Sequence, residues 1–176
     1  MNQAQIALYN EVLKIRPLPG ALLDIGCGDT SFIQNLARAL PLAQVTGLDI
    51  ALPKRAVAPS VSFVAGDAAK LPFTSESFDV ISSCMSMHHW GDKRAGLAEA
   101  HRALTLGGWL LIADPLKKGW LENRVLGWTV ERLDGGRFIG HGELASTLNE
   151  LGFEGVSVEL IPKSLGSLSL IKARKP

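Results

Sequence analysis

A carboxylate and two closely spaced glycines, Asp24, Gly26 and Gly28, are the first residues whose spacing indicates chemistry. They end the apolar run 21–25, which suits a buried parallel strand, and open a turn after it. Glycine can adopt a positive φ and lets a ligand touch the backbone, because it has no Cβ. Capping residues follow, and apolar residues at helical spacing predict a helix over 31–40. Free N–H groups at a helix start favour a phosphate or carboxylate, so the turn indicates a site for a nucleotide-like ligand.

Two further carboxylates follow predicted strands. Asp49 ends the run 44–49, and Asp67 comes shortly after the run 61–65. The carboxyl ends of parallel strands meet at one edge of an open α/β sheet, where ligands bind. Each aspartate could instead be an ordinary turn residue, since aspartate is common in turns and Gly-Asp is a frequent turn dipeptide.

A histidine-containing loop, Met85–Trp90, follows the fourth predicted strand and is expected at the same edge. His88 or His89 could take a proton from an acceptor hydroxyl or amine, because imidazole titrates near neutral pH. The alternative is that these side chains only pack or cap a helix. His101 lies inside a predicted helix and is expected to pack or face solvent, whereas His141 is expected to help cap the helix that follows it.

The order of the predicted elements indicates an α/β fold. Five strands alternating with helices predict a parallel sheet covered on both faces, and two β-like runs near the C-terminus predict an antiparallel final pair. Gly107 and Gly108 are expected to separate a helix from the fifth strand. The strands are expected at 21–25, 44–49, 61–65, 77–84, 109–113, 154–161 and 167–173, and the helices at 2–15, 31–40, 92–104, 116–133 and 142–151. Nothing marks a domain boundary, so residues 1–176 are expected to form a single domain.

The composition is that of an ordinary globular protein and argues against nucleic acid as a partner. Lys and Arg number 18 and Asp and Glu 17, so no net field attracts DNA, RNA or an anionic membrane. The start of the chain lacks the pattern of a secretory signal and no segment is long enough to span a bilayer, so a cytoplasmic location is expected. The cysteines, Cys27 and Cys84, have no second pair at metal-binding spacing, and no metal site is expected. The oligomeric state stays open.

Two nucleotide-binding classes place a glycine turn after the first strand, and the spacing separates them. The nicotinamide and flavin fingerprint needs a third glycine at position 31, which is Ser31. The other class has an acidic residue two positions before the first glycine, where Asp24 stands. At this point the sequence resembles the class I S-adenosylmethionine-dependent methyltransferases, in particular the small-molecule, type 11-like group with Leu-Asp-x-Gly-Cys-Gly in its first motif.

The resemblance covers roughly residues 20–115. Asp49 matches the carboxylate that binds the cofactor ribose hydroxyls, and Asp67 looks like the residue that accepts from the adenine amino group. Residues 77–81 resemble the strand that reaches the transfer site, and residues 101–112 resemble the helix, turn and strand that follow. These motifs imply a Rossmann-like methyltransferase fold, with a seven-stranded, mostly parallel sheet, an antiparallel last strand and helices on both faces.

One position departs from the family. Thr30 stands where the family often has a third glycine, near the expected methionine carboxylate of the cofactor. Its hydroxyl could donate to that carboxylate, or its bulk could weaken binding. The function implied is direct methyl transfer from S-adenosylmethionine to an unidentified small molecule; the alternative is a non-catalytic cofactor-binding or partner-binding module of the same fold.

The resemblance also implies which residues form the site. His88 and His89 are the candidate catalytic residues. The residues expected to bind the cofactor are Asp24, Gly26, Cys27, Gly28, Thr30, Asp49, Ile50, Asp67, Ala68 and Cys84. Those expected on the acceptor side are Met87, His88, Trp90 and Trp128, the last on the predicted helix 116–133.

Overall fold

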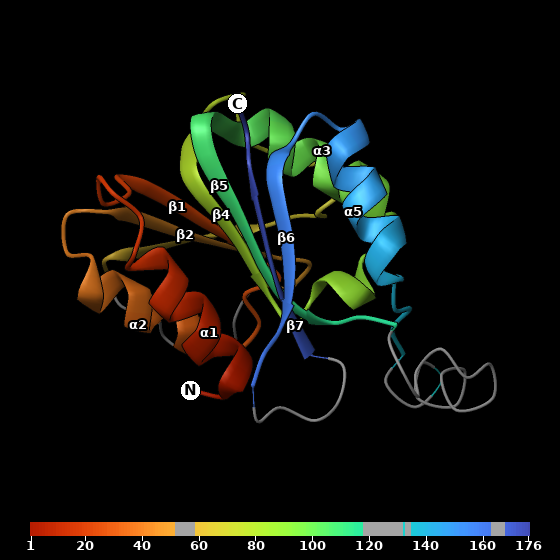
Figure 1. Cartoon of the computed structure of the whole chain (residues 1–176). Helices are drawn as coiled ribbons and strands as arrows, with labels where there is room; N and C mark the ends of the chain where they lie inside the picture. Colours follow the sequence, from red (N-terminus) through yellow and green to blue (C-terminus); the bar gives the residue numbers. More distant parts are fainter. Residues whose placement is uncertain (52–58, 118–131, 133–134, 163–167) are drawn as a thin grey trace.

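The computed structural model describes the chain except for residues 52–58, 118–131, 133–134 and 163–167 (Figure 1). The described residues form a seven-stranded sheet in the order β3-β2-β1-β4-β5-β7-β6. The strands are β1 (Ala21–Ile25), β2 (Gln44–Asp49), β3 (Val61–Ala65), β4 (Phe78–Cys84), β5 (Leu104–Pro115), β6 (Glu154–Leu160) and β7 (Leu168–Arg174). The helices are α1 (Gln3–Val12), α2 (Ser31–Ala39), the 3₁₀ turn η1 (Met87–His89), α3 (Lys93–Ala103) and α5 (His141–Glu150).

The strand directions confirm the predicted mixed sheet. Strands β1 to β5 pair in parallel, and β7 lies antiparallel between β5 and β6. From β1 the chain moves outward through β2 to β3 and then returns to β4 on the other side of β1. The strand order therefore reverses between β1 and β4, which is where open α/β sheets bind their ligands.

Helices cover both faces of the sheet, as Figure 1 shows. Leu22 of β1 packs with the buried side chains of α1 and α2, and its neighbour Leu23 packs with those of α3 and α5. Successive strand residues point to opposite faces, so a strand buried on both sides reads as a continuous apolar run. This explains why the run 21–25 was recognisable as a central strand.

Side chains cap the N-termini of helices α1 and α3. Asn2 and Gln5 form a capping box at α1, in which Asn2 Oδ1 accepts from the Gln5 N–H at 2.9 Å and Gln5 Oε1 accepts from the Asn2 N–H at 3.0 Å. Asp92 Oδ1 accepts from the Ala95 N–H at 2.9 Å and caps α3. In the part of the chain that the structure describes, no helix has both the length and the apolar character needed to cross a membrane.

The predicted start of the fifth strand was wrong. Strand β5 begins at Leu104, directly after α3, and Gly107 and Gly108 lie inside it. Leu104 pairs with Phe78, and the register with β4 shifts before the regular ladder resumes. The glycines accommodate this irregularity: Gly107 has φ +76°, and a Cβ on Gly108 would lie 2.9 Å from a backbone oxygen.

The prediction that His141 helps to cap α5 was also wrong. His141 is the first residue of α5, Gly140 occupies the capping position, and no side chain caps this end. The His141 ring instead lies 3.5 Å, through Nε2, from the carbonyl oxygen of Val158 on β6. The predicted helix 116–133 lies mainly outside the described residues.

Candidate functional site

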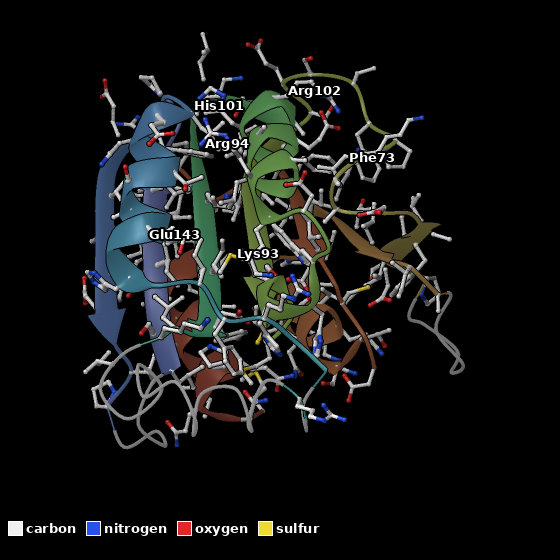
Figure 2. The ribbon with its side chains drawn as sticks, turned by 90° about the vertical axis from the view of Figure 1, so that its right-hand side faces the viewer. Phe73, Lys93, Arg94, His101, Arg102 and Glu143 are labelled. Carbon is white, nitrogen blue, oxygen red and sulfur yellow. The ribbon has the colours of Figure 1, made fainter. Side chains whose placement is uncertain are left out.

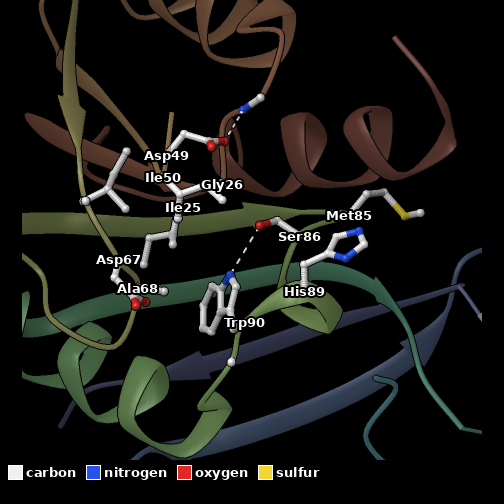
Figure 3. A pocket seen from close by; sticks show the side chains of 14 residues that line it. Ile25, Gly26, Asp49, Ile50, Asp67, Ala68, Met85, Ser86, His89 and Trp90 are labelled. Carbon is white, nitrogen blue, oxygen red and sulfur yellow. Dashed lines mark hydrogen bonds between the residues drawn. The ribbon is translucent and has the colours of Figure 1, made fainter. Parts of the chain in front are cut away.

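A pocket of about 390 Å³ opens at the carboxyl ends of β1, β2 and β4, at the point where the strand order reverses. Figure 3 shows Asp49, Ile50 and Asp67 on one side of it and Met85, Ser86 and His89 on the other. Its size falls within the range of small-molecule sites. Six of the residues expected to bind a cofactor line it, and these are Gly26, Gly28, Asp49, Ile50, Asp67 and Ala68.

The glycine turn after β1 presents bare backbone to this pocket. Gly26 has φ +75°, and a Cβ on it would lie 1.7 Å from Ser86 Oγ, so only glycine fits there. Its N–H donates to the carbonyl oxygen of Leu48 at 2.7 Å, which ties the turn to β2. Gly28 has φ +49°, and a Cβ there would meet no atom within 4 Å. The turn is thus tightly held at Gly26 and open at Gly28.

The half-buried Asp49 carboxylate joins the end of β2 to the glycine turn. Its Oδ2 accepts from the Gly28 N–H at 2.9 Å, and its Oδ1 accepts from the Ala51 N–H at 3.3 Å. A carboxylate at this position can accept further hydrogen bonds, because each oxygen carries two lone pairs. Asp49 can therefore support the turn and bind ligand hydroxyls at the same time.

The same side of the pocket combines a second aspartate with apolar surface. Asp67 Oδ1 accepts from the Ala69 N–H at 2.9 Å, which shapes the turn after β3, and Ala68 beside it is buried. Ile50 is 83% exposed although it lines the pocket. An exposed large apolar side chain at a pocket offers contact area to a flat apolar group.

The loop after β4 forms the other side of the pocket. Met85 has φ +53°, an uncommon conformation for a residue with a side chain, and it lies between the end of β4 and the start of η1. The indole N–H of Trp90 donates to Ser86 Oγ at 3.3 Å. His89 lines the pocket, and its ring centroid lies 4.0 Å from that of His88. The lining on this side is therefore largely aromatic and apolar.

His88 has a different place from His89. It is 3% exposed, its backbone N–H donates to Asp114 Oδ2 at 2.9 Å, and its ring Nδ1 lies 2.8 Å from Asp114 Oδ1. Burial raises the pKa of the Asp114 carboxyl, and the hydrogen bond from His88 opposes that effect. The pair fastens η1 to the end of β5. Sequence reasoning missed Asp114, although its position at the end of a predicted strand matches that of Asp49.

Asp24 lies inside β1, two residues before Gly26, and is not among the described residues that line the pocket. It is 1% exposed, and Ser82 Oγ donates to its Oδ1 at 2.6 Å. Burial raises the pKa of this carboxyl to about 7, the hydrogen bond from Ser82 opposes the rise, and the charge of Asp49 adds to it. Asp24 is thus bound to β4 through Ser82.

Thr30 also turns away from the pocket. It is buried, has φ +71°, and its Oγ1 accepts from Gln34 Nε2 at 2.7 Å, so the hydroxyl is bound to α2. The left-handed backbone explains why glycine suits this position in the family. Three further expected residues, Cys27, Cys84 and Met87, are likewise absent from the described pocket lining. Trp128 lies outside the described residues.

Four residues that line the pocket were not predicted. They come from the ends of β1 and β2, from the turn after β3 and from the position that follows the Met85–Trp90 loop, namely Ile25, Leu48, Gly66 and Gly91. Their adjacency to the predicted strand ends was the available signal. Met85 and Ser86 belong to the loop that was expected at this edge, and both line the pocket. Among the described side chains, no group of three or more His, Cys, Asp or Glu is placed to hold a metal ion.

Comparison with protein families and curated proteins gives consistent similarities. The sequence profile of a family described as "Methyltransferase domain" matches residues 23–112. The chain is 37% identical over 137 residues to the phthiotriol/phenolphthiotriol dimycocerosates methyltransferase of Mycobacterium leprae (strain TN), which covers 74% of this chain and 49% of that protein. It is 39% identical over 98 residues to the demethylmenaquinone methyltransferase of Roseiflexus castenholzii, covering 52% of this chain and 41% of that one. The chain spans about half the length, or less, of these curated relatives.

Solved structures share the fold. The 1,6-didemethyltoxoflavin-N1-methyltransferase of Burkholderia thailandensis, solved with 1,6-didemethyltoxoflavin and S-adenosylhomocysteine, matches with a TM-score of 0.72 at 20% sequence identity. The match covers 98% of this chain and 78% of that chain. The strand order and the antiparallel β7 therefore belong to a known architecture.

Proposed function

Since this chain belongs to the class I S-adenosylmethionine-dependent methyltransferases, we propose that it binds S-adenosylmethionine in the pocket at the ends of β1, β2 and β4 and transfers its methyl group to a small molecule. One observation carries this proposal: residues from the glycine turn, the end of β2 and the turn after β3, all expected to bind the cofactor, converge on one pocket at the reversal of strand order.

The residues present fit this cofactor. The turn lacks Cβ atoms where a ligand must approach, a carboxylate stands on the β2 side, and an exposed apolar side chain lies beside it. In the proposed arrangement Asp49 accepts hydrogen bonds from the ribose hydroxyls, Asp67 accepts one from the adenine amino group, and the turn at Gly28 faces the methionine end.

When bound, S-adenosylmethionine supplies a methyl group activated by its sulfonium. The chain then has to bind the cofactor, orient an acceptor behind the methyl group and exclude water. Met85, His89 and Trp90 provide the surface for the acceptor, and its apolar and aromatic character supports an acceptor with an apolar body.

We assign proton removal from the acceptor to an imidazole nitrogen of His89 rather than to His88. His89 lines the pocket, whereas Nδ1 of the buried His88 is held by Asp114. His88 is better suited to support the neighbouring His89 ring, because their rings are in contact. A base in this position would act on an acceptor hydroxyl or amine.

The proposal also covers the class of acceptor, the cellular compartment and the domain organisation. The near balance of 18 basic and 17 acidic residues supports a small-molecule acceptor over nucleic acid or a membrane surface. Cys27 and Cys84 are free thiols, which supports a reducing, cytoplasmic environment. We take residues 1–176 as one catalytic domain.

A methyl-transfer assay with labelled S-adenosylmethionine tests this function. A panel of apolar molecules bearing a hydroxyl or an amine is incubated with the wild-type protein and with Asp49→Ala. We expect labelled product with the wild-type protein and much less with Asp49→Ala. Binding of S-adenosylhomocysteine without turnover on any acceptor would favour the non-catalytic module instead.

A further inference from the structure

The turn and loop after β3 carry Asp67 and Ala68 to the pocket, and α3 holds this segment from outside. Its own backbone contributes one short-range bond, from the Lys70 N–H to the carbonyl oxygen of Asp67 at 3.0 Å. Beyond that turn the segment runs through Leu71 to Phe73 over the surface of α3. Figure 2 shows Arg102 of α3 beside Phe73.

A single ion pair on α3 makes most of the polar contacts with this segment. Arg102 donates two hydrogen bonds to the Glu99 carboxylate, from Nε to Oε1 and from Nη2 to Oε2, both at 2.8 Å. The same guanidinium donates to the carbonyl oxygens of Phe73, from Nη1 at 2.9 Å, and of Leu71, from Nη2 at 3.3 Å. Glu99 Oε2 in turn accepts from the Leu71 N–H at 2.9 Å. Leu71 is therefore held by both its N–H and its carbonyl.

The geometry of this pair is specific to arginine. A planar guanidinium can hold a carboxylate with one edge and reach two carbonyl oxygens with its remaining donors, whereas an ammonium group cannot satisfy all of these directions at once. The side chains are 34% exposed for Arg102 and 22% exposed for Glu99, so solvent screens the pair only in part. Neither is among the described residues that line the pocket.

Apolar packing adds a second link between α3 and the pocket wall. Leu71 is 5% exposed and Ala68 6% exposed within the core on this face. Gly96 of α3 lies against Trp90, since a Cβ on Gly96 would come within 2.6 Å of the indole and 3.5 Å of the Ala68 Cβ. Movement of the segment away from α3 would therefore move Ala68 away from Trp90.

We propose that Glu99 and Arg102 are positioning residues: they fasten residues 71–73 to α3 and so hold Asp67 and Ala68 where the pocket can bind the adenosine end of S-adenosylmethionine. This inference rests on the proposed function, because it assigns that end of the cofactor to Asp67. The pair touches no ligand and acts through the segment it holds.

The expected effect follows from the fraction of molecules in which the segment is correctly placed. The apparent dissociation constant equals the intrinsic constant divided by that fraction. If loss of the pair lowers the fraction from near one to about 0.1, the dissociation constant rises about tenfold. The adenosine fragment 5′-methylthioadenosine should lose the same factor as S-adenosylhomocysteine, since the affected contacts lie at the end that both share.

Calorimetric titration of S-adenosylhomocysteine and 5′-methylthioadenosine into Arg102→Ala, Arg102→Lys and Glu99→Gln tests the proposal. Arg94→Ala is the matched control, because Arg94 lies on the same helix and pairs with Glu150 at 2.8 Å on an exposed surface facing α5. We expect about tenfold weaker binding in the three variants, and less than twofold change in the control. Arg102→Lys keeps the charge and serves where Arg102→Ala fails to fold.

Two further results separate positioning from a purely structural role. Hydrogen exchange at the Leu71 amide should be faster in Glu99→Gln and Arg102→Ala than in the wild type, while Arg94→Ala leaves it unchanged. Lower melting temperatures with unchanged dissociation constants in the folded variants would overturn the positioning role. Absence of binding to the wild-type protein would overturn the proposed function itself, and the two failures are thereby distinguishable.

Discussion

The buried Asp24 carboxyl should make the protein less stable as the pH rises, and Asp24→Asn should remove that dependence. Burial raises the pKa of this group from an ordinary 3.8 to about 7 in the folded state. Between those values the folded protein keeps a proton that the unfolded chain releases, so the folded state binds more protons. Its contribution to stability is fully present below pH 3.8 and is lost as the pH rises through about 7.

The size of the effect follows from the two pKa values. The difference corresponds to about 4 kcal/mol of unfolding free energy once the carboxyl is ionised in both states. About 2–3 kcal/mol of this falls between pH 5 and pH 8. An asparagine at position 24 keeps an oxygen that can accept from the Ser82 hydroxyl, but it cannot ionise.

Urea unfolding of the wild type and Asp24→Asn at several pH values between 5 and 8 measures this difference. Other titrating groups contribute to both proteins, so they largely cancel in the comparison. The unfolding free energy of the variant relative to the wild type should grow by about 2–3 kcal/mol from pH 5 to pH 8. A difference that stays constant over this range would refute the reasoning, because it would mean that the folded Asp24 ionises as it does in the unfolded chain.

Three further predictions concern the pocket. Gly26→Ala places a Cβ 1.7 Å from a neighbouring hydroxyl oxygen and should lower the unfolding free energy, measured in urea, by more than about 2 kcal/mol. The Cβ in Gly28→Ala meets no atom within 4 Å, so this variant should lose about 1 kcal/mol. Equal losses of unfolding free energy in the two variants would contradict the geometry. Asp49→Ala should weaken S-adenosylhomocysteine binding by about 1.5–3 kcal/mol in calorimetry. Asp49→Asn keeps an acceptor for the glycine turn and should weaken binding less. Unchanged affinity in Asp49→Ala would make Asp49 a turn residue only. His89→Ala should slow methyl transfer with little change in cofactor affinity or stability. His88→Ala should destabilise the fold by about 1–3 kcal/mol, because it removes the ring hydrogen bond to the buried Asp114 carboxyl; the reverse pattern would exchange their roles.

The first three strands could be predicted because their signals are local. The runs 21–25, 44–49 and 61–65 match β1, β2 and β3 to the residue, since each is a short apolar run ended by glycine or aspartate. The start of β5 could not be predicted in this way. Leu104 joins the sheet because it pairs with Phe78, which lies 26 residues earlier. The glycine pair that begins three residues after Leu104 indicates a break when only the local sequence is considered.

The residues of the site also differ in whether the local sequence could predict their positions. Gly26 and Asp49, whose positions depend on backbone shape or on a strand end, were predicted from spacing, and both line the pocket. Burial and side-chain direction depend on the whole fold, so the positions of Asp24 and Thr30 away from the pocket could not be read from the motif. The pairing of His88 with Asp114 joins the ends of two strands and likewise required their register.

The most direct test of the account is thermal unfolding with and without S-adenosylhomocysteine, with nicotinamide dinucleotides as the comparison. A ligand at 100 times its dissociation constant adds about 2.7 kcal/mol to the unfolding free energy, which is large enough to see as a rise in melting temperature. We expect that rise with S-adenosylhomocysteine and none with the dinucleotides. An unchanged melting temperature at millimolar S-adenosylhomocysteine, or a rise with the dinucleotides instead, would contradict it.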